Sequence, residues 1–178
     1  MQIQFDKGDL SMTFDEIVKA RRSIRAYKDT PVERDTLLAV LEAGRLAPSA
    51  RNRQEWHFTV VTNQKLREQL AVACCGQSMV AQAPAAIVVW GTKEHVMTCK
   101  QSAASVDCSI ALTHMMLKAT ELGLGTCWLG AFKADEVSQA LSLPADAIIV
   151  AVTPLGYPDE APAARPRKSP DMIYTFMD

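Results

Sequence analysis

The sequence lacks the patterns that define several classes of protein. Its 178 residues carry a formal net charge of −1, which argues against nucleic acid as the main partner, because binding to it requires a broad basic face. The longest apolar runs, 87–90 and 148–153, have the length of strands and are too short to cross a membrane. The first residues, 1–6, have neither the basic start nor the apolar core of a signal peptide. We therefore expect a cytoplasmic protein that binds neither nucleic acid nor a membrane.

Cysteine and histidine are too few and too scattered for metal or disulfide chemistry. The chain has five cysteines, an odd number without C-x-x-C spacing, and three dispersed histidines. Such a set argues against a disulfide framework and against a zinc or iron–sulfur site. We expect no metal, and thiols that are buried or incidental. A G-x-G-x-x-G motif is absent too, so a nicotinamide cofactor would have no Rossmann site.

The composition fits one domain over residues 1–178. It is 48% hydrophobic and 22% charged, ordinary for a globular protein, and no repeat or linker divides the chain. The segment 156–178 differs from the rest, because its prolines oppose regular structure. Since this segment also carries basic residues, we expect it to lie across another surface as an extended arm.

Helix signals recur along the chain. A capping box at Thr13–Glu16 predicts a helix from Phe14 into Arg21, and Thr30–Glu33 is a second capping box with proline at the first helical position. The longest signal covers 102–122 and is apolar around most of its circumference, so this helix must be buried on several sides. Its polar residues fall in one narrow stripe, made of Asp107, His114, Lys118 and Glu121. Shorter helices are expected over 64–73 and 134–141.

Three apolar runs between these helices read as strands. They cover 56–61, 85–90 and 147–155. Strands that are separated by helices predict an α+β or α/β domain.

Arginine is concentrated in two short turns at opposite ends of the chain. They are Arg21-Arg22-Ser23-Ile24-Arg25 and Arg165-Pro166-Arg167-Lys168. Because the net charge is close to zero, these clusters are local features. Guanidinium groups match phosphate oxygens bidentately, so two such turns suit a phosphate, although most charge runs are simply solvated.

Four motifs in sequence resemble the nitroreductase family of FMN-dependent flavoproteins. They are, in chain order, the first arginine turn, residues 47–58 (APSARNRQEWHF), residues 123–130 (GLGTCWLG), and 155–158 (LGYP) taken together with the second arginine turn. The match covers nearly the whole chain in the family's order. The chain departs from the family at Glu55, where a proline usually precedes the tryptophan, and in the short stretch 91–101.

The resemblance implies a fold, a cofactor and an assembly. The fold would be α+β with three layers, a central mixed β-sheet flanked by helices, in a homodimer whose C-terminal arm (156–178) extends onto the partner subunit. FMN would lie at the subunit interface, with arginines on its phosphate, a loop of the other subunit near its ring, and main chain around 129–130 donating to it. The residues assigned to FMN are Arg21, Arg22, Ser23, Arg25, Pro48, Ser49, Ala50, Asn52, Gln54, Leu129, Gly130, Arg165 and Arg167.

The implied activity needs no catalytic side chain, because flavin N5 carries the hydride and the protein supplies orientation. The leading hypothesis is an oxidoreductase that passes hydride from NADH or NADPH through FMN to a nitroaromatic, quinone or enone. Two alternatives stay open: a specialised relative such as a reductive dehalogenase or a flavin-consuming enzyme, and a flavin-binding protein without turnover. The stretch 91–101 is too short for a closing lid, so we expect a permissive acceptor site.

Overall fold

The protein is built around one four-stranded sheet. The structure is a computed structural model and describes residues 12–92 and 94–177. In sheet order β1-β2-β4-β3, the strands are β1 (Trp56–Val61), β2 (Ala85–Gly91), β4 (Ile148–Gly156) and β3 (Gly125–Thr126). All three ladders are antiparallel. The expected mixed character is therefore limited to one isolated parallel bridge, between Ser23 and Thr126.

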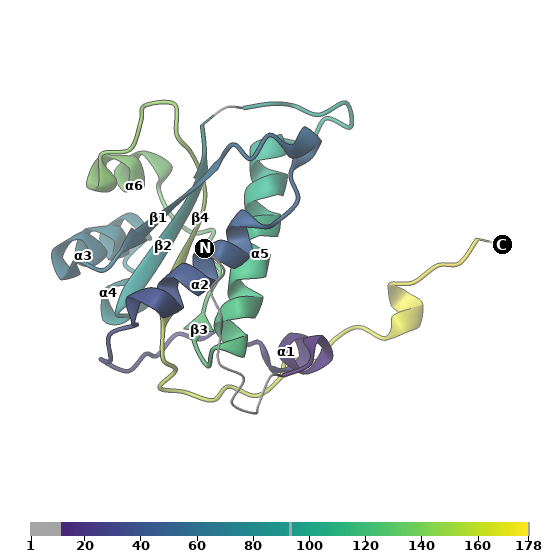
Figure 1. The fold of residues 1–178 in the computed structure, drawn as a ribbon, viewed down its shortest axis with the longest axis horizontal. Coiled ribbons are helices and arrows are strands. Elements are labelled where there is room, and N and C mark those ends of the chain that lie inside the picture. The colour runs from purple at the N-terminus through teal and green to yellow at the C-terminus, as the bar shows by residue number, and fades with distance from the viewer. Residues whose placement is uncertain (1–11, 93, 178) are drawn as a thin grey trace.

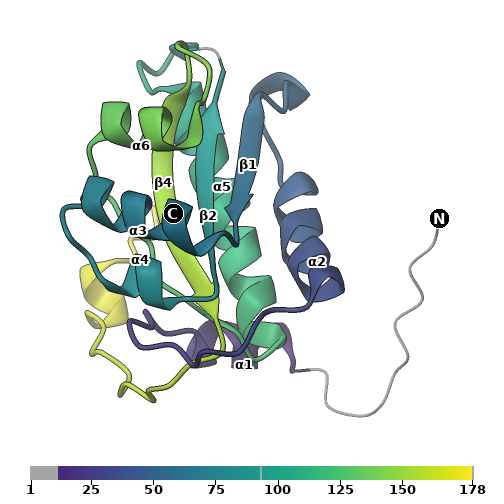
Figure 2. The same cartoon turned by 90° about the vertical axis from the view of Figure 1, so that its left-hand side faces the viewer.

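Helices cover both faces of this sheet, which gives the three layers that the sequence implied (Figures 1 and 2). They are α1 (Phe14–Ala20), α2 (Arg34–Arg45), α3 (Gln64–Ala73), α4 (Met79–Gln82), α5 (Ala103–Glu121) and α6 (Ala134–Leu141). Two short 3₁₀ helices cover Ala50–Asn52 and Pro170–Met172. Helices α2 and α5 pack on one face, and α3, α4 and α6 pack on the other. The α+β class and the three-layer arrangement are confirmed.

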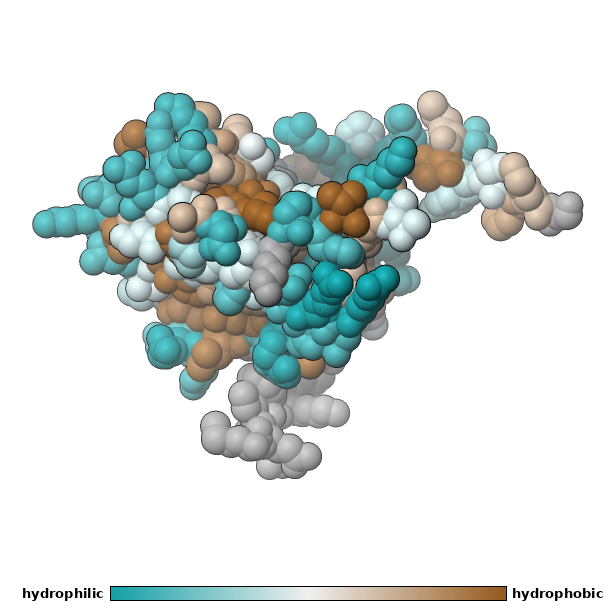
Figure 3. Space-filling model, turned by 90° about the horizontal axis from the view of Figure 1, so that it is seen from above, coloured by the Kyte–Doolittle hydropathy of each residue, from teal (hydrophilic) through white to brown (hydrophobic). Residues whose placement is uncertain are grey.

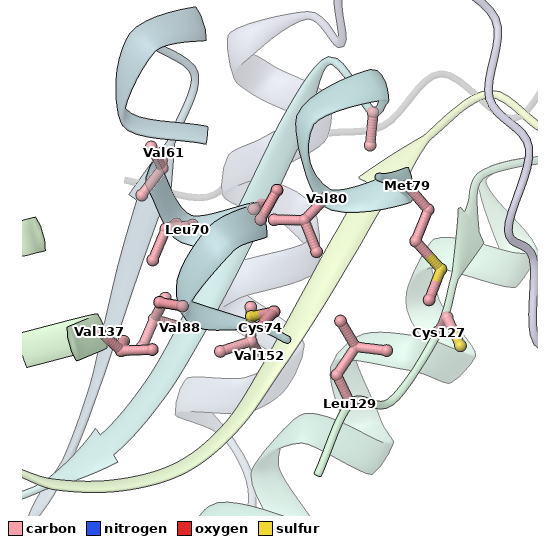
Figure 4. Packing of buried hydrophobic residues seen from close by; sticks show 14 of the residues in the cluster. Val61, Leu70, Cys74, Met79, Val80, Val88, Cys127, Leu129, Val137 and Val152 are labelled. Atoms are coloured by element: carbon pink, nitrogen blue, oxygen red, sulfur yellow. The ribbon is translucent and has the colours of Figure 1, made fainter. Parts of the chain in front are cut away.

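The alternation of side chains along β2 divides the core in two. Ile87 and Val89 point to the layer of α2 and α5, whereas Val88 points to the opposite layer. Figure 4 shows that second cluster, where Leu70 of α3 and Val137 of α6 meet the sheet. Every residue of β2 is buried, as a strand covered on both faces requires.

Helix α5 crosses the sheet as the long central helix that its composition predicted. Ser102 caps its first turn by accepting from the Ser105 amide at 3.2 Å, and Gly123 follows its end with a left-handed φ of 73°. It packs closely on α2 at Gly44, where an added Cβ would lie 2.8 Å from Cγ of Met115. That contact requires glycine in the last turn of α2.

The second capping box does not form. Helix α2 begins at Arg34, and its N-cap residue is Glu33, which makes no side-chain capping bond. Residues 30–33 have neither helix nor strand, and the helix starts later than the proline predicted.

Directly after β4, residues 157–159 pair with residues 26–28, and the chain then leaves the body of the protein. Residues 159–169 have no helix or strand, and the final part stands away from the sheet (Figures 1 and 3). It carries exposed apolar side chains, namely Met172, Ile173, Tyr174, Phe176 and Met177. No helix of residues 12–92 and 94–177 combines the length and the apolar character needed to span a bilayer.

Candidate functional site

The segment 23–28 is held between two distant parts of the chain. On one side, Ile24 donates its amide to the Thr126 carbonyl at 2.9 Å. On the other side, Tyr27 forms a bridge with Pro158. Gly125 makes the first contact possible, since a Cβ there would lie 2.7 Å from Cγ1 of Ile24. The backbone around Arg21–Arg25 is therefore fixed by residues more than a hundred positions away.

Glu160 directs the C-terminal segment toward the arginine turn. Its carboxylate accepts from the backbone amides of Arg25 and, at 3.3 Å, of Ala26. The Asp159 amide returns a bond of 2.9 Å to the Ala26 carbonyl. The sequence motifs did not single out Glu160. Its role depends on free backbone amides of the turn 25–26, which can bind an anionic group and lie far from Glu160 in the sequence.

The two arginine clusters line one cavity of about 510 Å³. Its walls are Val18, Lys19, Arg21, Arg22, Ser23, Arg25, Pro162, Ala163, Ala164, Arg165 and Arg167. Among the described residues, the side chains of these arginines are in no ion pair, and Glu160 contacts the turn through its backbone amides. A concave surface with several unpaired guanidinium groups is suited to a multiply charged anion such as a phosphate ester.

The arginines of this cavity differ in how they are held. The Arg22 guanidinium donates to the carbonyls of Lys19 at 2.6 Å and Arg21 at 2.9 Å, so it caps the C-terminal end of α1. Arg25 donates weakly to the Ser23 carbonyl at 3.3 Å, and Arg167 to that of Arg165 at 3.3 Å. The structure thus gives Arg22 a partner within the protein, while Arg25 and Arg167 keep most of their donors for a ligand.

The second predicted group lies at the far end of α5. Figure 1 shows α1 near the C-terminal end of that helix and the 3₁₀ helix Ala50–Asn52 near its N-terminal end. The Ala50 amide donates to both carboxylate oxygens of Asp107, each at 3.1 Å. From Asp107 to the end of α5 is about 20 Å along the helix axis. One chain therefore does not bring Pro48, Ser49, Ala50, Asn52 and Gln54 together with the arginines.

The loop of this second group has an unusual backbone. Arg51, Asn52 and Gln54 have left-handed φ values of 54°, 54° and 53°, each disfavoured for a residue with a side chain. Ser49 Oγ accepts from the Gln54 amide at 3.0 Å, and this bond closes the loop. Such a conformation persists only where neighbouring groups enforce it, and the bond to Asp107 is the one that reaches into the core.

Asp107 is the residue that sequence reasoning placed wrongly. It was expected in a polar stripe of α5, but its side chain is buried, with 7% exposed. Together with burial, its charge raises the pKa of the neighbouring Cys108 thiol to about 12. The sequence did offer one signal of this burial: Asp107 is an acidic residue in a helix that is apolar around most of its circumference. A carboxylate that such a helix buries needs a hydrogen-bond donor.

The third predicted element, Leu129–Gly130, is only partly available for a ligand. Leu129 is buried, and its amide donates to the Val152 carbonyl at 2.9 Å, so it cannot donate to a cofactor as expected. Gly130 is exposed, and a Cβ there would meet nothing within 4 Å. Of the two predicted amides, only that of Gly130 makes no backbone hydrogen bond within the described part of the chain.

Comparison with known proteins agrees with this architecture. The model of the nitroreductase family matches residues 18–102 and 73–157. A protein of Methanothermobacter thermautotrophicus, named provisionally as an NADH dehydrogenase/NAD(P)H nitroreductase, is 35% identical over 89% of this chain and 84% of its own. This chain belongs to the nitroreductase family.

Two solved structures share the fold over almost their whole length. A nitroreductase family protein of Clostridium difficile 630 superposes with a TM-score of 0.84 at 31% identity, covering 94% of this chain and 99% of the other. An FMN-dependent nitroreductase of Clostridium difficile R20291 gives a TM-score of 0.78 at 31% identity, covering 91% and 98%. The family resemblance read from four short motifs is thereby confirmed.

Proposed function

We propose that the protein is an FMN-dependent oxidoreductase that takes hydride from NADH or NADPH and reduces a small acceptor such as a nitroaromatic, quinone or enone. The observation that carries the proposal is the cavity in which unpaired arginines from both ends of the chain converge. The names of the relatives, an NAD(P)H nitroreductase and an FMN-dependent nitroreductase, support the same chemistry.

The residues present fit the phosphate end of FMN. Arg21, Arg25, Arg165 and Arg167 line the cavity, and among the described residues their guanidinium groups are in no ion pair, so they would hold the phosphate by charge-assisted hydrogen bonds. Ser23 would face the polyol chain. When bound, FMN supplies a ring that accepts and delivers hydride, which no side chain can do.

A homodimer would complete the site. The loop 48–54 lies at the opposite end of α5 from the arginines, so its place beside the flavin ring requires a second copy of the chain. Apolar side chains are exposed on α1 and α2, including Phe14 at 69% and Leu38 at 45%, and Leu46, directly after α2, is 64% exposed. The exposed apolar residues of the C-terminal segment support an arm that packs on the partner subunit.

Anaerobic reduction tests this function. Purified protein loaded with FMN should lose its yellow colour when NADH or NADPH is added without oxygen, and the colour should return when an acceptor is added. A protein that binds FMN but stays yellow under both nucleotides would be a flavin carrier, and the proposed activity would be wrong.

A further inference from the structure

A second cavity, of about 350 Å³, lies at the loop end of α5. Its lining residues are Ala50, Arg51, His95, Met97, Thr98 and Cys99. The volume is that of a small ligand site and accommodates one substituted aromatic ring. Two walls face each other here: the strained loop 49–54 and the connection that follows β2.

The connection after β2 forms a short, internally bonded wall. Met97 donates its amide to the Gln101 carbonyl at 2.8 Å, and Lys100 donates to the Met97 carbonyl at 2.8 Å. The Ala103 amide ties this turn to the start of α5 through a 2.8 Å bond to the His95 carbonyl. The sequence predicted a stretch too short for a lid, and the turn instead builds one side of a cavity.

The opposite wall presents a permanent positive charge. Arg51 is exposed on a backbone held at a φ of 54°, next to the Ala50 amide that Asp107 anchors. None of the residues that line this cavity is acidic, and Arg51 is in no ion pair among the described residues. The remaining lining is largely apolar or weakly polar, as Met97 and Cys99 illustrate.

We propose that this cavity is the acceptor site and that Arg51 makes it favour acceptors whose aromatic ring carries an anionic group, such as a carboxylate or sulfonate. The proposal rests on the proposed function, because it takes the loop 48–54 to lie beside the flavin. The ring would contact Met97 and Thr98, and its anionic group would accept from the Arg51 guanidinium. Arg51 is then a specificity-determining residue.

The reaction balances with the nicotinamide as reductant. For a nitroarene, NADPH gives up a hydride and becomes NADP⁺, and the two electrons pass to the nitro group. Together with these electrons, the nitro group takes up two protons, one that derives from the hydride and one H⁺ from the solvent. One of its oxygens leaves as water, and the product is a nitrosoarene. Arg51 takes no part in this transfer and acts only on how the acceptor is held.

Two acceptors of equal size and different charge test the proposal. The ratio of kcat/KM for 4-nitrobenzoate to that for neutral 4-nitrobenzamide should be about ten in the holoenzyme at low salt, the effect of one charge-assisted contact at an exposed site. In Arg51→Gln the ratio should fall below about two, and Arg51→Lys should keep part of it. The matched control is Arg53→Gln, which removes a charge from the same loop at a position that does not line the cavity.

The controls separate failure of this inference from failure of the proposed function. Flavin content and anaerobic reduction by NADPH should be equal in all four proteins. A holoenzyme that is reduced normally but shows no charge preference would overturn the inference and leave the function intact, as would an equal loss of preference in Arg53→Gln. Loss of flavin from Arg51→Gln alone would mean that Arg51 holds the cofactor, and it would also overturn the inference. A wild-type protein that NADPH does not reduce would overturn both.

Discussion

At the scale of single residues, the anchor between Asp107 and Ala50 links the core to the strained loop. The carboxylate is buried in α5, and both of its oxygens accept from the Ala50 amide at 3.1 Å. A buried carboxyl group is unfavourable unless it is hydrogen-bonded, and the Ala50 amide supplies that hydrogen bond. It holds a loop whose left-handed residues would otherwise relax.

Asp107→Asn should therefore loosen the loop. We expect the free energy of unfolding to fall by about 1–3 kcal/mol, because an amide oxygen replaces a charged acceptor in a buried site. Urea denaturation measures this change, and Asp146→Asn, at an exposed position, serves as the control with a change below about 0.5 kcal/mol. Equal effects of the two substitutions would show that the anchor contributes nothing.

The raised pKa values of two buried thiols, those of Cys74 and Cys108, predict how the free energy of unfolding depends on pH in the alkaline range. Burial raises the pKa of Cys74 to about 11 and, with the charge of Asp107, that of Cys108 to about 12. In the unfolded chain a thiol ionises near pH 8.5, so above this pH the unfolded state binds fewer protons than the folded state. Stability should consequently fall as pH rises from about 9 to 11.

The Cys74→Ala, Cys108→Ala double variant isolates that effect. Its absolute stability is expected to be lower, because two buried side chains are truncated, but its slope between pH 9 and 11 should be shallower than that of the wild type. Chemical denaturation at several pH values gives both slopes. Identical slopes would contradict the assignment to these thiols.

At the scale of elements, the contact of α2 with α5 depends on Gly44. Gly44→Ala would improve helix propensity by up to about 1 kcal/mol, but the new Cβ would lie 2.8 Å from Cγ of the buried Met115. We expect overpacking to prevail and stability to fall by about 1–3 kcal/mol. Thermal unfolding should show a lower Tm for Gly44→Ala and little change for Gly130→Ala, where nothing lies within 4 Å. A higher Tm for Gly44→Ala would mean that Met115 adjusts freely.

Local signals predicted most of the elements well. Helices α3 and α6 have the expected bounds, and the strand at 56–61 is confirmed, because periodicity and flanking turns agreed there. The predicted start of α2 was wrong, because the expected capping box does not form and the helix begins at Arg34 without a side-chain cap. The short helix α4 was missed, because four residues are too few to show a period.

Residues of the candidate site could be predicted where they belong to a sequence motif, but not where their role depends on tertiary contacts. The arginine clusters were named from sequence, and the structure places them around one cavity. The roles of Asp107 and Glu160 required knowing which amides face them. The Leu129 amide was assigned to a cofactor, whereas antiparallel bridging with Val152 uses it within the protein.

At the scale of the whole molecule, one chain presents two half-sites, the arginine cavity and the loop 48–54, which lie at opposite ends of α5. We expect a homodimer in which each half-site meets the other half of its partner, with the C-terminal arm adding contact area. Sedimentation at micromolar concentration should show a dimer, and a chain ending at Lys168 should dissociate more readily, because exposed apolar residues such as Phe176, at 86%, are removed. A flavin-loaded monomer, or equal affinities of the two chains, would count against this assembly.

The measurement that tests the central claim most directly is the affinity for FMN compared with riboflavin, which lacks only the phosphate. Titration of the apoprotein should show that the wild type prefers FMN strongly, since arginines of both clusters line the cavity that would take the phosphate. Arg25→Gln should lower that preference by about tenfold or more, while riboflavin affinity stays within about twofold. Lys168→Gln removes a charge just beyond the cavity and should leave the preference unchanged. Equal affinities of the wild type for FMN and riboflavin would contradict the account.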